Sequence, residues 1–319
     1  MRYITLGNTD VKVSQLCMGT VNYGTKVSEE EAFRQMDRFV EAGGNFLDTA
    51  RVYGDGISEE TIGKWFVMSG NRDKIILCTK GGHPVMGDWA NSRCDVENLT
   101  KDLSESLKAL QTDHIDLYLM HRDNPKVPVA ELIDWMEAQK QTGKILHYGC
   151  SNWTLARIRE AQEYAESKGY EGFVASEQMC SLADVNARMV AGADMHVLDA
   201  ADCQYHQETG MSMMAYMSIA NGYLMKQVRG TEVGQFQKMI YDNEANQAMI
   251  EWLKANIHEK ETEYTIEDIC FHYIYSLPFS AIALAAFSNE KQMEAALRSC
   301  EVEVPGCLIE QVVKYKVER

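Results

Sequence analysis

Short apolar runs that end in a polar residue alternate along the chain with longer stretches of helical spacing. This alternation is typical of repeated βα units, because a buried parallel strand is apolar on both faces whereas a covering helix is apolar on one. The pattern predicts strands over residues 14–20, 45–48, 75–80, 115–121, 145–151, 173–178, 211–216 and 281–286. It predicts helices over residues 28–42, 58–68, 96–110, 129–142, 154–167 and 265–277.

The ends of these helices carry typical capping residues. Ser28 and Ser58 each precede acidic residues, as expected for an N-cap followed by side chains that favour the positive end of a helix dipole. Gly43, Gly143 and Gly169 lie where glycine commonly ends a helix. The caps support the helix boundaries that the apolar spacing predicts.

Eight strands separated by helices in 319 residues favour one α/β domain over residues 1–319, a single closed (β/α)8 or TIM barrel. An open, doubly wound parallel sheet is the alternative, but the first strand is not followed by the glycine-rich fingerprint of a dinucleotide-binding sheet. Residues 1–18 hold Gly7-Asn8 between two alternating runs, which predicts an N-terminal β-hairpin that caps the bottom of the barrel.

Composition excludes several classes of partner. Asp and Glu number 47 against 31 Lys and Arg, and the net charge of −16 would repel nucleic acid and an anionic membrane surface. Residues 281–287 are too short an apolar stretch to cross a bilayer, and the N-terminus lacks the apolar core of a signal peptide. Nine cysteines without paired spacing indicate reduced thiols. We therefore expect a cytoplasmic protein; its oligomeric state is not specified by the pattern.

The chemistry is expected at the carboxyl ends of the strands, where β/α barrels carry their functional groups. Three consecutive runs end in Asp48, Lys80 and His121, and Tyr53 follows Asp48 by five residues. A phenol has a pKa near 10, so a tyrosine that protonates a carbonyl oxygen needs a cation to stabilise its anion. Lys80 would supply that cation, Asp48 would hold it, and His121 would orient the substrate oxygen. A metal site formed by Asp48, His121 and Asp123 is disfavoured because Lys80 would repel the ion.

Three segments of this constellation, Asn45–Gly54, Leu77–Gly82 and Asp116–Arg122, resemble signatures of the aldo-keto reductases. The resemblance extends over nearly the whole chain and includes the complete Asp, Tyr, Lys and His tetrad. It implies a reductase that moves a hydride between a nicotinamide cofactor and an aldehyde or ketone, or the reverse oxidation of the alcohol. Tyr53 would be the general acid/base, with Lys80 and Asp48 adjusting its acidity.

The same resemblance implies a cofactor site. A Ser-Asn pair and a Gln would bind the nicotinamide carboxamide, an aromatic residue would stack on the ring, and a loop with Gly and Lys would hold the pyrophosphate. The candidate cofactor residues are Gly19, Thr20, Asp48, Ser151, Asn152, Gln178, Tyr216, Ser218, Gly222, Lys226, Ser288, Asn289 and Gln292.

The segment for the adenosine end departs from the family pattern. Ser288 stands where Arg or Lys is common, and Ala296 stands where an Asn is expected. Glu290 would oppose a 2′-phosphate, and Lys291 is the compensating cation. The family habit implies NADP(H), whereas the local charge favours NAD(H).

The substrate candidates are polar and aromatic residues near the expected mouth: Asn22, Tyr23, Trp89 and Arg122, with Trp153 beside them. They favour a sugar or a related small carbonyl compound. Two other hypotheses remain open. One is a cofactor-binding regulatory module like the potassium-channel β subunits, and the other is a lyase or epimerase with a tightly held cofactor.

Overall fold

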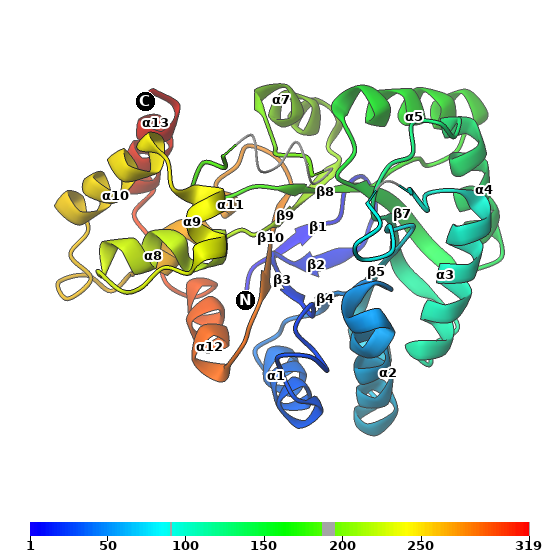
Figure 1. Ribbon diagram of the computed structural model, residues 1–319, viewed down its shortest axis with the longest axis horizontal. Coiled ribbons are helices and arrows are strands. Elements are labelled where there is room, and N and C mark those ends of the chain that lie inside the picture. Colours follow the sequence, from blue (N-terminus) through cyan, green and yellow to red (C-terminus); the bar gives the residue numbers. More distant parts are fainter. Residues whose placement is uncertain (90, 187–194, 319) are drawn as a thin grey trace.

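The eight predicted strands form a closed parallel barrel in the computed structural model of the protein, which describes residues 1–89, 91–186 and 195–318 (Figure 1). The strands are β3 (Leu16–Gly19), β4 (Phe46–Asp48), β5 (Ile76–Gly81), β6 (Ile115–Met120), β7 (Ile145–Ser151), β8 (Ala175–Met179), β9 (Ser212–Tyr216) and β10 (Ala281–Ala286). They follow one another in chain order around the barrel, and β10 pairs with β3 to close it. The closed barrel is confirmed over the open sheet.

The six helices predicted from apolar spacing are present. They are α1 (Glu29–Glu41), α2 (Ile57–Ser69), α3 (Val96–Ala109), α4 (Val129–Gln141), α5 (Leu155–Lys168) and α11 (Ile266–Tyr275). Ser28 caps α1 by accepting from the Glu31 amide, but Ser58 does not cap α2. The N-cap there is Gly56, and the Ser58 hydroxyl is buried against Thr20 and Thr49.

Among the residues that the structure describes, six further α-helices lie in the C-terminal half of the chain. They are α7 (Ala200–Thr209), α8 (Tyr223–Val228), α9 (Gln235–Tyr241), α10 (Glu244–Asn256), α12 (Glu290–Ser299) and α13 (Gly306–Glu318). With six and seven residues, α8 and α9 span less than two turns, too few for apolar periodicity to be visible. No helix in the described part of the chain is long and apolar enough to cross a membrane.

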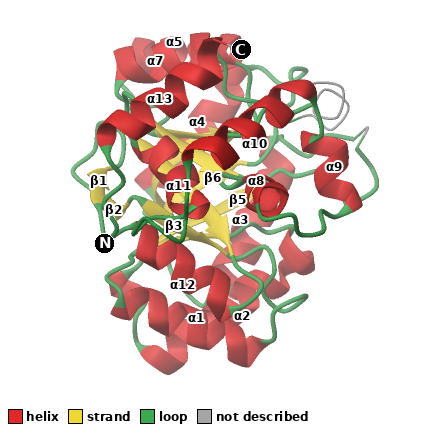
Figure 2. Ribbon diagram, turned by 90° about the vertical axis from the view of Figure 1, so that its left-hand side faces the viewer, coloured by secondary structure: helices red, strands yellow, loops and turns green. Residues whose placement is uncertain are grey.

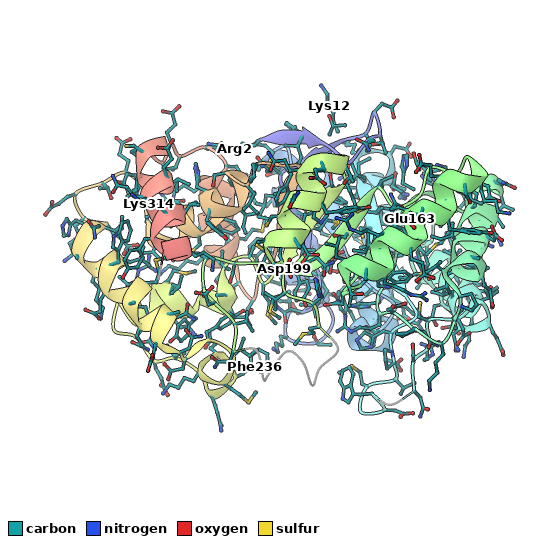
Figure 3. The ribbon with its side chains drawn as sticks, turned by 90° about the horizontal axis from the view of Figure 1, so that it is seen from above. Arg2, Lys12, Glu163, Asp199, Phe236 and Lys314 are labelled. Carbon is teal, nitrogen blue, oxygen red and sulfur yellow. The ribbon has the colours of Figure 1, made fainter. Side chains whose placement is uncertain are left out.

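The N-terminal hairpin closes one end of the barrel. Its strands β1 (Tyr3–Thr5) and β2 (Lys12–Ser14) pair antiparallel, and Leu6 and Val13 pack into the same apolar cluster as interior residues of the barrel strands. The hairpin lies opposite α8 and α9 in Figure 2, and Figure 3 shows Arg2 and Lys12 at the end opposite Phe236 of α9. The other end of the barrel is therefore left for the functional groups.

Candidate active site

The interior of the barrel changes from apolar to charged toward the carboxyl ends of its strands. Phe46 and Cys78 belong to the interior apolar cluster, and Asp48 and Lys80 lie two residues beyond them. Since side chains two residues apart share a face of a strand, Asp48 and Lys80 also point into the barrel. There the Lys80 ammonium donates to Asp48 Oδ1 at 2.6 Å and to the Thr49 carbonyl at 3.0 Å. Both residues are at most 1% exposed.

Tyr53 and His121 complete the predicted tetrad above this ion pair. Lys80 Nζ lies 5.3 Å from the centre of the Tyr53 ring, and the Tyr53 and His121 rings meet edge to face with centroids 5.9 Å apart. His121 follows the last residue of β6, and its amide extends the β5–β6 pairing by donating to Gly81 O. The structure thus brings together the four residues predicted from the strand ends.

A tight turn places Tyr53 over the strand ends. The Tyr53 amide donates to the Ala50 carbonyl, and residues 53–56 form one 3₁₀ turn before α2. Gly56 has φ +93°, and a Cβ there would collide with the Arg51 guanidinium. Because its φ is positive, any other residue at position 56 would strain this turn.

The surroundings of the tetrad set its protonation. Burial disfavours the Lys80 ammonium, but the carboxylates of Asp48 and Glu177 outweigh this effect and raise the pKa of Lys80 well above its usual value. Burial raises the pKa of the Tyr53 phenol, and the Lys80 ammonium opposes that rise. Burial, together with Lys80, lowers the pKa of His121 well below its usual value. At neutral pH the site holds an ammonium, a protonated phenol and a neutral imidazole.

Sequence reasoning overlooked Glu177. This β8 residue is 3% exposed and its Oε2 lies 3.3 Å from Lys80 Nζ, so two carboxylates face one ammonium. Asp48, Cys78 and Glu177 offer their ligand atoms within 4.8 Å of one another. The ammonium of Lys80 lies against both carboxylates, which disfavours a metal there.

Glu177 and Gln178 are consecutive residues of β8, so their side chains face opposite sides of the strand. Gln178, which stays a predicted cofactor residue, is fully buried; its Nε2 donates to the Trp153 carbonyl, and its Oε1 has no hydrogen-bond partner among the described residues. Ser176, two residues before Gln178, contacts His206 of the outer helix α7. Ser176 and Gln178 therefore share the outer face of the barrel, and Glu177, which lies between them in the chain, points inward. A charged residue inside an apolar run was the available signal, because such a charge needs a partner.

We expect Glu177→Gln to change the pH dependence of both stability and rate. Burial raises the pKa of Glu177 to about 8, so the folded protein holds a proton that the unfolded chain releases near pH 4.3. The stability linked to this group is complete below about pH 4 and is lost as pH rises through about 8. Between pH 4 and pH 9 the wild type should therefore lose about 5 kcal/mol of stability that the variant keeps.

The carboxylate of Glu177 also raises the pKa of Tyr53, so the limb of the pH–rate profile set by the phenol should move to lower pH in the variant. Denaturant unfolding from pH 4 to 9 and the pH–rate profile check the two effects. Glu59→Gln is the matched control, because Glu59 is buried with a pKa raised to about 7 but bonds to Thr79 and not to Lys80. An unshifted profile in Glu177→Gln would contradict the coupling to Tyr53.

The cofactor candidates at the ends of β7 and β9 form one cluster. The Tyr216 hydroxyl donates to Asn152 Oδ1 at 2.7 Å, and Asn152 Nδ2 donates to Ser151 Oγ at 2.8 Å. Asn152 adopts φ +61°, which Asn tolerates better than most residues. Amide, hydroxyl and aromatic groups at the ends of β7 and β9, on either side of β8, fit the carboxamide and ring of a nicotinamide.

The other cofactor candidates differ in how free their side chains are. Thr20 and Ser218 are buried and bond to the backbone of Asp48 and Leu284, and a Cβ at Gly19 would press on Leu284. Gly222 precedes α8, whose Lys226 lies 3.4 Å from Gln237.

The expected adenosine end lies at the start of α12. Asn289 caps α12 by accepting from the Gln292 amide, and Gln292 accepts from the Ser288 amide. Ser288 and Lys291 are exposed. Ala296 is 1% exposed and packs in the core, so residue 296 presents no polar group at this end.

Only part of the predicted substrate set faces the mouth. Arg122 is buried beside His121, and Trp89 is 54% exposed with its ring against His83. Tyr23 is 1% exposed and packs in the layer between strands and helices, with its hydroxyl toward Met18 Sδ. Tyr23 is therefore a core residue, because the aromatic ring after β3 turns outward.

Two other residues of the expected mouth are also placed by the structure. Trp153 is fully buried in the same outer layer as Tyr23, so it is unavailable to a substrate. Asn22 is partly exposed and holds a turn in which its carbonyl accepts from the amides of Lys26 and Val27.

Comparison with known proteins gives a consistent picture. The model of the Aldo/keto reductase family matches residues 15–314. YrpG of Bacillus subtilis, named an uncharacterized oxidoreductase, is 32% identical over 318 residues that cover 95% of this chain and 92% of YrpG. Norsolorinic acid reductase of Emericella nidulans is 33% identical over 51% of this chain and 46% of its own length.

Solved structures agree with the sequence relatives. The holo form of the aldo-keto reductase AKR11C1 from Bacillus halodurans is 26% identical, with a TM-score of 0.75 over 99% of this chain and 96% of that one. The matched family spans the barrel and every residue of the tetrad. This chain is an oxidoreductase that belongs to the aldo/keto reductase family.

Proposed function

We propose that the protein uses NAD(P)H to reduce the carbonyl of a small, sugar-like aldehyde or ketone, or oxidises the corresponding alcohol, with Tyr53 as the proton donor. The observation that carries the proposal is the position of the Tyr53 phenol above a buried Lys80 ammonium and beside the His121 ring. A phenol, a cation and an imidazole at one mouth are the groups that a carbonyl oxygen needs as it gains negative charge.

Each residue of the tetrad has a distinct task in this reaction. When bound, the nicotinamide supplies the hydride. Tyr53 transfers its proton to the substrate oxygen, and Lys80 stabilises the phenolate that remains. Asp48 fixes the ammonium through the 2.6 Å hydrogen bond. The neutral His121 donates an N–H to the substrate oxygen and orients it without adding a charge.

The residues that would hold the nicotinamide are Ser151, Asn152 and Tyr216, whose groups fit it as described above. The pyrophosphate and adenosine would then extend over Lys226, at the end of β9, and Ser288, at the end of β10. These two strands pair with each other, and β3 separates β10 from β4, the strand that ends in Asp48.

A spectrophotometric screen tests the proposal directly. Sugars, sugar acids and simple aldehydes are offered with NADH and with NADPH, and the decay of absorbance at the nicotinamide band is followed. We expect many turnovers per protein molecule with at least one carbonyl. Oxidation of a single equivalent of cofactor would instead favour a regulatory module, and product formation without net cofactor oxidation would favour a lyase or epimerase.

Cofactor choice gives a prediction of its own. A 2′-phosphate carries close to two negative charges and requires a nearby cation, but the start of α12 offers Ser288, Asn289 and Glu290, with Lys291 as its only cation. We expect NAD(H) to bind within about tenfold of NADP(H), a difference of at most about 1.4 kcal/mol. Ser288→Arg should shift the ratio toward NADP(H).

Fluorescence-quenching titrations with both cofactors measure this ratio without turnover. Ser167→Arg, on the exposed face of α5, adds the same charge away from α12 and should leave the ratio unchanged. A hundredfold preference of the unmodified protein for NADP(H) would contradict the prediction.

A further inference from the structure

Arg122 is a buried cation beside the tetrad that forms no ion pair with any described carboxylate. It follows His121 at the end of β6 and is 9% exposed. Its Nη1 donates to the His121 carbonyl at 2.9 Å, and its Nε is buried without a partner. A guanidinium carries five N–H donors, and a buried charge without a counter-charge is costly. The mouth therefore holds an unused binding group of defined chemistry.

The neighbouring charges do not neutralise Arg122. Asp123, the next residue, is 3.2 Å from the Arg157 guanidinium, and Asp48 and Glu177 both face Lys80. Arg122 and Lys80 both lower the pKa of Glu177, but burial outweighs them and raises it to about 8, so Glu177 is a weak counter-charge for Arg122. Asp48 and Lys80 cancel each other, so the mouth carries the net positive charge of Arg122.

Arg122 lies on the substrate side of the mouth. In the order of the closed barrel, β6 is four strands from β10 in either direction. The residues proposed for the phosphates of the cofactor, Lys226 and Ser288, follow β9 and β10, across the barrel from Arg122. The phosphates of a dinucleotide placed along those two strands are therefore remote from this guanidinium, whereas the carbonyl held by Tyr53 and His121 is adjacent to it.

We propose that Arg122 binds a carboxylate of the substrate, so that the enzyme acts on an aldehyde or ketone that is also an acid, such as an oxidised sugar. This inference rests on the proposed function. The planar fork of a guanidinium matches a carboxylate with two parallel hydrogen bonds.

A phosphate fits this part of the mouth less well than a carboxylate. It carries up to two charges and would require a second cation. The Arg93 guanidinium donates to the His83 carbonyl but is ion-paired with Asp102. The imidazoles beside Arg122 are those of His83 and His121, and burial lowers the pKa of His83 to about 4 and that of His121 well below its usual value. Both rings are uncharged at neutral pH and cannot replace that cation.

Pairs of carbonyl compounds that differ in the acid group test the proposal. The pairs are succinate semialdehyde with butanal, 4-formylbenzoate with its methyl ester, and glucuronate with glucose. We expect kcat/KM to favour the acid by at least about tenfold in one pair or more, since hydrogen bonds to charged groups are worth this much. In Arg122→Gln, kcat/KM should fall at least about tenfold more for the acid than for its neutral partner, so the preference should disappear.

Two further variants control for charge and geometry. Lys126→Gln removes one positive charge from the same loop, but Lys126 is exposed, and this variant should keep the wild-type preference. Arg122→Lys keeps the charge and loses the fork, so its preference for the acid should fall between those of the wild type and Arg122→Gln. If Arg122→Gln fails to give the circular dichroism spectrum of the folded protein, Arg122→Lys decides.

The possible outcomes separate the inference from the proposed function. A preference for the acid that is undiminished in Arg122→Gln or in Arg122→Lys, or equal rates of the wild type with acid and neutral partners, would overturn the inference and leave the reductase intact. A preference for glyceraldehyde 3-phosphate over glyceraldehyde that exceeds every carboxylate preference would overturn the choice of carboxylate. Failure to reduce any carbonyl with either cofactor would overturn the proposed function itself.

Discussion

Tyr53→Phe is expected to lower kcat at least a hundredfold, because general acid catalysis contributes about 10²- to 10⁴-fold and this variant removes the only proton that the mechanism transfers from the protein. The Phe ring retains the shape of the site, including the edge-to-face contact with His121. Affinity for the nicotinamide cofactor should change little, since the proposed cofactor contacts are at Ser151, Asn152 and Tyr216. Stopped-flow kinetics and a cofactor titration measure the two quantities separately.

Tyr164→Phe is the control for this variant. The Tyr164 hydroxyl lies on the outer surface and donates to Asp134, so its removal should leave kcat unchanged. Wild-type rates in Tyr53→Phe, on whichever carbonyl the screen identifies, would show that another group donates the proton. A large loss of cofactor affinity would instead show that the phenol helps to hold the cofactor.

The barrel and most of its helices could be predicted because local pattern and tertiary structure agree there. Most side chains of strands such as β6 and β10 are apolar. This is expected for a barrel strand, because one of its faces packs in the barrel interior and the other packs against the surrounding helices. The short helices α8 and α9 could not be predicted in this way. Packing of buried side chains such as Leu224 and Tyr241 holds them, and that packing depends on residues distant in sequence.

The tetrad could be predicted because each member lies at or just beyond the end of a strand, where the fold alone directs a side chain into the mouth. Glu177 and Tyr23 are the two residues whose positions this reasoning did not predict. Glu177 was missed because only the last polar residue of the predicted strand, Gln178, was considered, and the residue before it faces the other side, toward Lys80. Tyr23 follows a strand end too, but the loop after β3 turns its ring into the outer core.

Lys80→Met is expected to lower kcat/KM at least about tenfold and to move the phenol limb of the pH–rate profile to higher pH. The ammonium opposes the rise that burial and the carboxylates of Asp48 and Glu177 cause in the pKa of Tyr53, so its removal raises that pKa further. A phenol of higher pKa is a weaker acid, and the proton transfer slows. Unchanged limbs in the variant would mean that Lys80 does not act through Tyr53.

The same variant should lose stability in a way that depends on pH. Removing one partner of a buried ion pair costs roughly 3–5 kcal/mol because the other charge remains buried. Without the ammonium, the pKa values of Asp48 and Glu177 rise, so the folded variant binds more protons than the unfolded chain, and its deficit should shrink as pH falls. Lys80→Met combined with Asp48→Asn removes both charges and should recover part of the stability at pH 8 while activity stays low. Recovery of activity in the double variant would show that the ion pair serves only to hold the barrel together, and that the proton donor does not depend on it.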